Sequence, residues 1–246
     1  MRPKERLDRL LVERGLASSR QQARALIMAG KVVAGGNPVE KPGTLVRPDI
    51  SLGLKGRGCP FVSRGGLKLE AALKAFEIDP RGKRAMDVGA STGGFTDCLL
   101  QKGAARVFAV DVGYGQLAWR LQQDPRVVNL ERTNIRYLDF QEVGEPLDLI
   151  VVDTSFISVE KFLSRLRGMV KRGGDLVVLV KPQFEVGRGE VEKGGIIRDR
   201  TKQMRVVERV RRAGEELGLV ARGVIESPIK GAKGNREFFV HFVRSR

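Results

Sequence analysis

The 246-residue sequence predicts an α/β protein: a small N-terminal α+β domain, then a Rossmann-like sheet that is mostly parallel and ends in an antiparallel strand. Three observations support this fold class. Two short amphipathic helices and several turns fill the first 50 residues, and apolar runs of strand length alternate with helical stretches after residue 65. The last two apolar runs are joined by a segment too short for a helical crossover, which predicts an antiparallel pair.

The first domain, residues 1–58, is expected to begin with two helices. Leu7, Leu10 and Leu11 lie on one helical face, and Gly15 can end that helix. The segment "SRQQ" at 19–22 has the spacing of a capping box, which predicts the start of the second helix. The following segment "KVVAGGNPVEKPGTLV" predicts short strands joined by Gly, Asn and Pro turns.

A linker is expected at residues 59–64, within the stretch "SLGLKGRGCPFVSR", which holds three glycines and a proline without a sustained period. The second domain, residues 65–246, alternates strands and helices, as in a parallel sheet covered on both faces. The expected strands are 84–88, 106–111, 127–131, 147–153, 175–181, 219–226 and 236–243; the expected helices are 66–77, 94–102, 115–122, 158–171 and 200–217.

The charge of the chain predicts a polyanionic partner. There are 45 Lys and Arg against 29 Asp and Glu, a net charge of +16. Residues 1–65 hold 13 of these basic residues and 5 of the acidic ones, so about half of the surplus lies in a quarter of the chain. Such clustering favours a phosphate-binding surface over a merely solvated one, although charge alone also fits a membrane surface.

The cysteine and histidine content indicates the redox compartment and bears on metal binding. Two cysteines and one histidine exclude a Cys/His zinc site and favour a reducing compartment, and no metal is expected. The start "MRPKERLDRLL" is charged where a signal peptide needs an apolar run, and no apolar run has the roughly 18 residues of a membrane-spanning helix. We therefore expect a soluble cytoplasmic protein.

The segment "MDVGASTGGFTDCLL" is the expected cofactor site. An acidic residue closes the first strand, a glycine-rich turn follows, and a helix begins, and parallel sheets bind ligands at the carboxyl ends of their strands. The spacing of Gly89, Gly93 and Gly94 does not match GxGxxG, and no GK[ST] follows. Both NAD and ATP are therefore disfavoured.

Carboxylates around this turn favour a cationic cofactor. Asp111, at the end of the second strand, can accept hydrogen bonds from ribose hydroxyls, and Asp87 and Asp153 add negative charge. One such aspartate is most often a turn or cap residue, but three would repel a phosphate and attract the sulfonium of S-adenosylmethionine, the cofactor we expect. The expected cofactor contacts are Asp87, Gly89, Ser91, Thr92, Gly93, Gly94, Phe95, Asp111, Asn134 and Asp153.

The run "LVVLVKPQFEVG" places a lysine where a buried strand ends. Asp153 ends the fourth strand and Lys181 the fifth, so both side chains are expected at the same rim of the sheet. Glu237 begins the antiparallel last strand at that rim, and Lys68 lies on the helix before the first strand. Taken singly, such a lysine and aspartate would usually be a structural ion pair.

Lys68, Asp153, Lys181 and Glu237, in this order, resemble the tetrad of the FtsJ-like ribose 2'-O-methyltransferases. Nearly the whole chain, with "VSRGGLKLEAAL", "DVGYGQLAWRL", "VDTSFIS" and "GNREFF", is similar to the TlyA family of rRNA methyltransferases, historically labelled haemolysins. The linker segment "GRGCPF" departs from the family pattern. Residues 4–50, above all "SSRQQARALIMAGKVVAGG", resemble the alpha-L RNA-binding module of a small-subunit ribosomal protein.

The resemblance implies that the tetrad is catalytic, with Lys181 as the base for a ribose hydroxyl of cytidine in ribosomal RNA. It implies ribosomal RNA or ribosomal subunits as the partner, and we expect neither a membrane nor a stable protein partner. The residues expected to contact RNA are Arg20, Gln22, Arg24, Lys31 and Arg64. Two rivals remain, a secreted or membrane-active haemolysin and a non-catalytic RNA-binding protein that has kept the fold.

Overall fold

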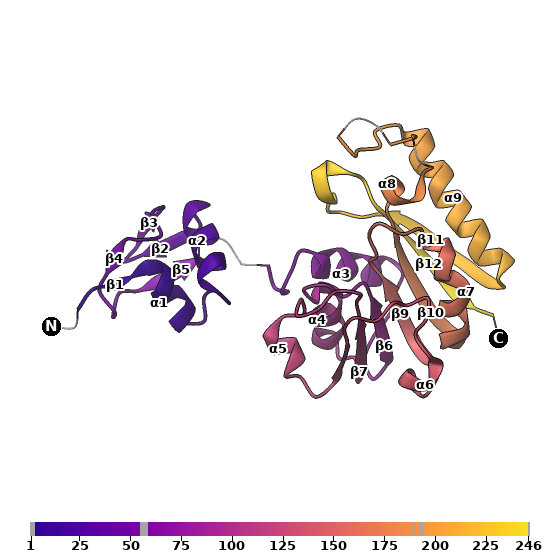
Figure 1. Cartoon of the computed structure of the whole chain (residues 1–246), viewed down its shortest axis with the longest axis horizontal. Helices are drawn as coiled ribbons and strands as arrows, with labels where there is room; N and C mark the ends of the chain where they lie inside the picture. Colours follow the sequence, from indigo (N-terminus) through magenta and orange to yellow (C-terminus); the bar gives the residue numbers. More distant parts are fainter. Residues whose placement is uncertain (1–2, 55–58, 188, 192–193, 246) are drawn as a thin grey trace. The chain divides into compact units, whose positions relative to one another are not determined.

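The computed structural model describes residues 3–54, 59–187, 189–191 and 194–245, which form two compact units, Met1–Pro60 and Phe61–Arg246 (Figure 1). Residues 55–58, the expected end of the first domain, lie outside the described residues. Residues 61–64, expected in the linker, fall in the second unit, because the buried ring of Phe61 packs so tightly on Gly66 that a Cβ there would lie 2.2 Å from Phe61 Cγ.

The N-terminal unit packs two helices against short strands. Its strands form an antiparallel sheet in the order β3-β2-β5 and a separate pair, β1-β4, and its core is built from apolar residues of both helices and of β2. Ser19 caps the second helix by accepting a hydrogen bond from the Gln22 amide, as the sequence predicts. The elements are β1 (Glu5–Arg6), α1 (Leu7–Glu13), α2 (Arg20–Met28), β2 (Val32–Ala34), β3 (Asn37–Val39), β4 (Leu45–Val46) and β5 (Leu52–Leu54).

A buried carboxylate joins the two helices of this unit. Asp8 of α1 is fully buried and accepts hydrogen bonds from Arg6, at 3.0 Å each, and its Oδ2 lies 3.4 Å from a guanidinium nitrogen of Arg20 at the start of α2. The hydrogen bonds from Arg6, with a smaller contribution from Arg20, hold the pKa of Asp8 below its ordinary value despite the burial. The carboxylate is therefore a charged link inside a small core.

The second unit is built on a seven-stranded sheet in the order β11-β12-β10-β9-β6-β7-β8. Its strands are β6 (Arg84–Val88), β7 (Arg106–Val110), β8 (Val127–Leu130), β9 (Leu147–Val152), β10 (Val170–Val180), β11 (Leu219–Glu226) and β12 (Phe238–Arg244). The neighbouring strands in the run β10-β9-β6-β7-β8 are parallel, and β12 is antiparallel to both β10 and β11. This topology confirms the predicted fold class.

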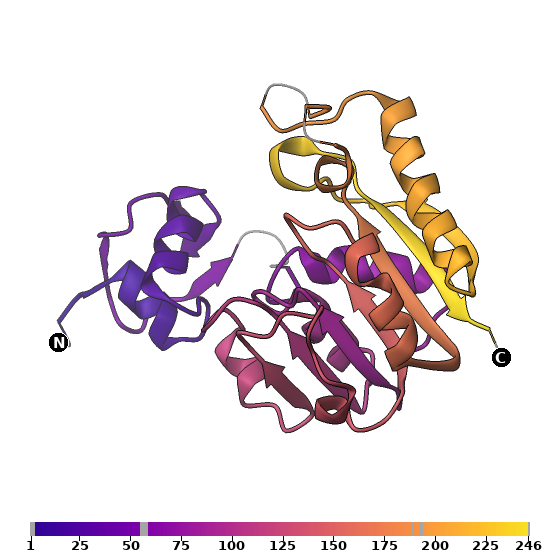
Figure 2. The same cartoon turned by 45° about the vertical axis from the view of Figure 1, so that its right-hand side comes forward.

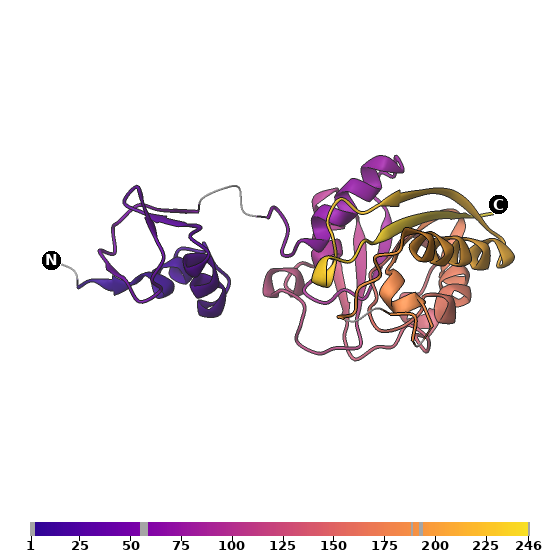
Figure 3. The same ribbon diagram turned by 90° about the horizontal axis from the view of Figure 1, so that it is seen from above.

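The helices of this unit are α3 (Gly65–Ala75), α4 (Gly94–Gln101), α5 (Trp119–Gln122), α6 (Phe140–Val143), α7 (Glu160–Met169), α8 (Pro182–Glu185) and α9 (Arg200–Glu216), with a 3-10 turn at Ala232–Gly234. Helices α3, α4 and α5 share one apolar core with the sheet, and α6, α7 and α9 share the other. Figures 2 and 3 show α3, in purple, and α9, in orange, on opposite sides of the strands. The sheet is thus covered on both faces.

Two predicted boundaries differ from the structure by more than two residues. Strand β10 begins at Val170 rather than 175, because the chain pairs with β9 at Val170, bulges, and resumes pairing at Asp175. The helix expected at 115–122 is confined to Trp119–Gln122, and the short helices α6 and α8 were not expected. Among the described residues, no helix is both long and apolar enough to cross a membrane.

Replacing Asp8 by alanine should destabilise the N-terminal unit by about 1–3 kcal/mol, because Arg6 and Arg20 lose a buried partner. Hydrogen exchange of the intact chain, read by mass spectrometry over residues 7–34, measures the loss of protection. Asp49→Ala is the matched control, since its ion pair with Arg47 is exposed to solvent. Equal loss of protection in the two variants would contradict a stabilising role of the buried carboxylate.

Candidate active site

The carboxyl ends of the parallel strands and the start of β12 meet at one rim of the sheet. Asp153 directly follows β9 and Lys181 directly follows β10. Glu237 immediately precedes β12, whose first residue, Phe238, pairs with Val180. The fold therefore brings three of the four tetrad residues to this rim, from strands that lie next to one another.

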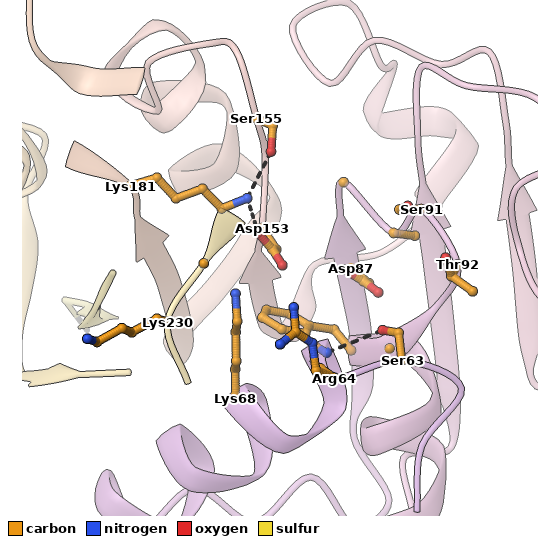
Figure 4. A pocket seen from close by; sticks show the side chains of 16 residues that line it. Ser63, Arg64, Lys68, Asp87, Ser91, Thr92, Asp153, Ser155, Lys181 and Lys230 are labelled. Carbon is orange, nitrogen blue, oxygen red and sulfur yellow. Dashed lines mark hydrogen bonds and ion pairs between the residues drawn. The ribbon is translucent and has the colours of Figure 1, made fainter. Parts of the chain in front are cut away.

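Two lysine–carboxylate ion pairs form here. Lys181 Nζ lies 2.5 Å from Asp153 Oδ1 and donates a 2.9 Å hydrogen bond to Ser155 Oγ, and Lys68 Nζ, from α3, donates a 2.6 Å hydrogen bond to Glu237 Oε2. The lysine side chains are 12% exposed for Lys68 and 10% for Lys181. Both lysines line one cavity of about 350 Å³, into which their ammonium groups point (Figure 4). The amines are thus held in place and still reachable by a substrate.

A glycine directly after β6 allows the ends of β6 and β9 to approach each other closely at this rim. Gly89 has a φ of +86°, and a Cβ on it would lie 2.6 Å from the carbonyl oxygen of Asp153. Any larger residue would be strained and would push the β9 end away. Because residue 89 has no side chain, the backbone of the glycine-rich turn forms part of the cavity wall, where a ligand could contact it.

Asp87 is a buried carboxylate with half of its hydrogen-bonding capacity unused. Its Oδ2 accepts hydrogen bonds from the Thr96 amide, at 2.9 Å, and hydroxyl, at 2.8 Å, while its Oδ1 has no partner among the described residues. Burial is the main reason that the pKa of Asp87 is raised to about 7; the negative charges of Asp153 and Asp111 contribute to the rise, and the hydrogen bonds from Thr96 oppose it. An incoming cation would find an acceptor at this position.

A second cavity, of about 470 Å³, adjoins the first and shares Gly89, Ser91, Asp153 and Ser155 with it. Asp111 lines this cavity; its Oδ2 accepts from the Ser91 amide at 2.8 Å and its Oδ1 from the Gly113 amide at 2.7 Å. Each oxygen keeps a lone pair that could accept a hydroxyl. The two cavities form a continuous site with the size and the polar side chains of a nucleoside-binding pocket.

Most of the expected cofactor contacts line these cavities. Asn134 lines the second one, although its Oδ1 also accepts from the Arg136 amide at 3.1 Å. The exception is Gly93, which lines neither cavity because it packs under α5, where a Cβ would lie 2.3 Å from a methyl of Leu121. The expected contacts that line the first cavity are Asp87, Gly89, Ser91, Thr92, Gly94, Phe95 and Asp153.

The residues expected to contact RNA are divided between the two units. Arg64 lies at the start of α3, outside the N-terminal unit. It lines the first cavity, which also holds Lys68 and Lys181 and is named the catalytic cavity (Figure 4). In the N-terminal unit, Arg20 pairs with Asp8, and Gln22 Oε1 accepts hydrogen bonds from the amide and hydroxyl of Ser18. Arg24 and Lys31 are exposed.

Several residues that line the first cavity were not predicted from the sequence, and Ser155 and Lys230 are two of them. Ser155, which accepts the hydrogen bond from Lys181, lies two residues beyond Asp153, and that proximity in "VDTSF" is the signal that could have identified it. Lys230 lies in the irregular segment between the last two strands and carries no sequence signal beyond its charge. Phe156, which lines the second cavity, is 89% exposed with a φ of +66°.

Comparisons with known proteins agree with this geometry. The model of the FtsJ-like methyltransferases matches residues 61–244, and that of the S4 domain matches residues 5–49. The chain is 51% identical over 241 residues to the 16S/23S rRNA (cytidine-2'-O)-methyltransferase TlyA of Mycobacterium tuberculosis, covering 98% of this chain and 90% of the relative.

Two further relatives carry a different name. The chain is 38% identical to hemolysin A of Brachyspira hyodysenteriae, covering 97% of this chain and 99% of the relative. A solved structure from Streptococcus thermophilus, described as a candidate hemolysin, superposes with a TM-score of 0.77 at 42% identity, covering 99% of this chain and 89% of that one. The likeness to both kinds of relative spans both units.

The raised pKa of Asp87 makes stability depend on pH in a predictable direction. Between about pH 4, the unfolded value, and pH 7, the folded chain keeps a proton that the unfolded chain has released, so stability falls as pH rises. In Asp87→Asn this contribution is absent, and the oxygen that accepts from Thr96 remains. The unfolding free energy of wild type, measured with urea, should therefore fall relative to the variant up to about pH 7 and then level off. A difference that does not change with pH would contradict the assignment.

Proposed function

Since the chain belongs to the FtsJ-like methyltransferases and, among them, to the TlyA family, we propose that it transfers a methyl group from S-adenosylmethionine to a ribose 2'-hydroxyl of cytidine in ribosomal RNA. The observation that carries this proposal is the meeting of two carboxylate-paired lysines, Lys68 and Lys181, in one cavity beside a glycine-rich turn. The S4 match and the basic N-terminal region support RNA as the substrate.

The residues around the turn fit S-adenosylmethionine. Its ribose hydroxyls would be held by Asp111, its adenine would lie in the second cavity near Asn134, and its cationic part would face the unpaired Oδ1 of Asp87. Gly89 has no side chain, so the backbone of the glycine-rich turn can contact the ligand directly. When bound, S-adenosylmethionine supplies a methyl group on a positively charged sulfur.

The chain's own contribution is to position the RNA hydroxyl and to remove its proton. Lys181 would accept that proton as a neutral amine, after its own ammonium proton has been released to solvent, while Asp153 and Ser155 hold the amine in one orientation. Lys68, held by Glu237, would orient the ribose in the same cavity. Alignment of the reacting groups can supply roughly 7–11 kcal/mol and general-base catalysis about 3–5 kcal/mol, so positioning is the larger effect.

Phe156 is suited to hold the target base. Phe156 follows Ser155 directly, and its ring is exposed and packs against the ring of Phe184, tilted by 49°, with 4.8 Å between the ring centroids. A solvent-exposed aromatic in a left-handed conformation is unfavourable unless it serves a purpose, and aromatic rings are the usual platforms for unstacked RNA bases. Arg24 and Lys31 of the S4 domain would contact the RNA elsewhere.

Lys181→Ala should reduce methyl transfer by at least about 100-fold while the affinity for S-adenosylmethionine persists, because the proton acceptor is lost but the cofactor contacts remain. Transfer of a labelled methyl group to isolated ribosomal subunits measures the first quantity and calorimetric titration the second. Lys161→Ala, an exposed lysine on α7, is the control. Turnover like that of the control would refute the role of Lys181.

Asp111→Asn should weaken S-adenosylmethionine binding by about tenfold or more, since a charged acceptor for the ribose hydroxyls becomes a neutral amide. Calorimetric titration of the cofactor measures the change. Asp124→Asn, which alters a carboxylate paired with Arg126 outside both cavities, serves as the control. Equal affinities of the two variants would place the ribose elsewhere.

A further inference from the structure

A basic pocket of about 460 Å³ adjoins the catalytic cavity. Its charged lining consists of Arg198, Lys230, Lys233 and Arg236, and none of the described residues that line it is acidic. Lys230 lines both the basic pocket and the catalytic cavity, so the two hollows share a wall. In Figure 4 the Lys230 side chain extends away from Lys68 and Lys181. None of the described residues that line this pocket belongs to the tetrad or to the expected cofactor contacts.

The positive charge of the pocket is only partly neutralised. Lys230 and Lys233 are exposed, and neither forms an ion pair within the described part of the chain. Arg236 lies 3.1 Å from Glu226, but that carboxylate also pairs with Arg200 at 2.9 Å. One acidic group therefore serves two arginines, and the pocket keeps a surplus of positive charge available to an anion.

The pocket is held by buried hydrogen bonds. The side chain of Asn235, only 3% exposed, accepts from the Ile197 amide at 3.0 Å and donates to the Gly195 carbonyl at 2.9 Å. These bonds fasten the loop before β12 to the segment before α9. Lys233 has a φ of +57°, an unfavourable conformation for a residue with a side chain, and such conformations concentrate at functional sites.

The pocket is also tied to the tetrad. Gly231 packs directly on Glu237, where a Cβ would lie 1.8 Å from Glu237 Oε1, the carboxylate that binds Lys68 through its other oxygen. The loop that carries Lys230 and Lys233 thus cannot shift without moving that ion pair. An anion bound by these lysines would be fixed relative to the catalytic cavity.

We propose that the basic pocket binds a phosphodiester of the RNA strand next to the target ribose, an inference that rests on the proposed function. Each nucleotide carries an anionic phosphate beside its ribose, so an RNA whose ribose enters the catalytic cavity presents a phosphate to the adjoining wall. Unpaired, exposed lysines are suited to this contact because they can displace counterions from the RNA without losing protein partners. The phosphate would set the position of the ribose along the cavity.

The test is the double variant Lys230→Ala/Lys233→Ala, assayed by methyl transfer from labelled S-adenosylmethionine to isolated ribosomal subunits. The KM for the subunits should rise about tenfold or more, and the dependence of log KM on log salt concentration should become shallower by about 1. Lys230→Arg/Lys233→Arg, which keeps both charges, should retain a KM close to that of wild type. Lys74→Ala/Lys161→Ala removes two exposed lysines outside both pockets and is the matched control.

The affinity for S-adenosylmethionine shows whether the variant is intact. If the double variant fails to bind it, Lys233→Ala alone is used, because Lys233 lines only the basic pocket. A KM and salt dependence equal to those of the control, with active wild type, would overturn this inference and leave the proposed function standing. No transfer by wild type to either subunit would overturn the proposed function and this inference with it.

Discussion

The two lysine–carboxylate ion pairs at the rim of the sheet are the constraint on which the site depends. Each places an ammonium group in a largely buried position, which costs free energy unless a carboxylate and further hydrogen bonds accompany it. Lys181 has Asp153 and Ser155, and Lys68 has Glu237. The antiparallel β12 is needed for this arrangement, because it delivers a carboxylate to the rim at which the parallel strands end.

The same rim separates two chemical environments. Toward β6 and β7, the carboxylates of Asp87 and Asp111 lie beside the glycine-rich turn, and these acidic groups suit a cationic nucleoside. Toward β12, Lys68, Lys181 and the lysines of the basic pocket supply positive charge, which suits a nucleic acid. Opposite charges on the two sides of one cavity would orient a cationic methyl donor and an anionic acceptor toward each other.

The sequence predicted the sheet well because its strands are long apolar runs, and the strand ends then located Asp87, Asp111, Asp153 and Lys181 without further information. What it could not predict depends on packing. Arg64 was expected to contact RNA, but its place in the catalytic cavity follows from Phe61 entering the second core. Residues with no periodic or motif signal, such as those of the basic pocket, become visible only when separate loops are brought together in space.

We propose that the tetrad acts on a ribose hydroxyl. The most direct measurement of this role is the identity of the methylated nucleoside, obtained by digesting ribosomal RNA from subunits treated with the wild-type chain and separating the nucleosides by mass spectrometry. Wild type should yield 2'-O-methylcytidine, and Lys181→Ala should not. Methylation of a base, or a modification that persists in the variant, would contradict this role of the tetrad.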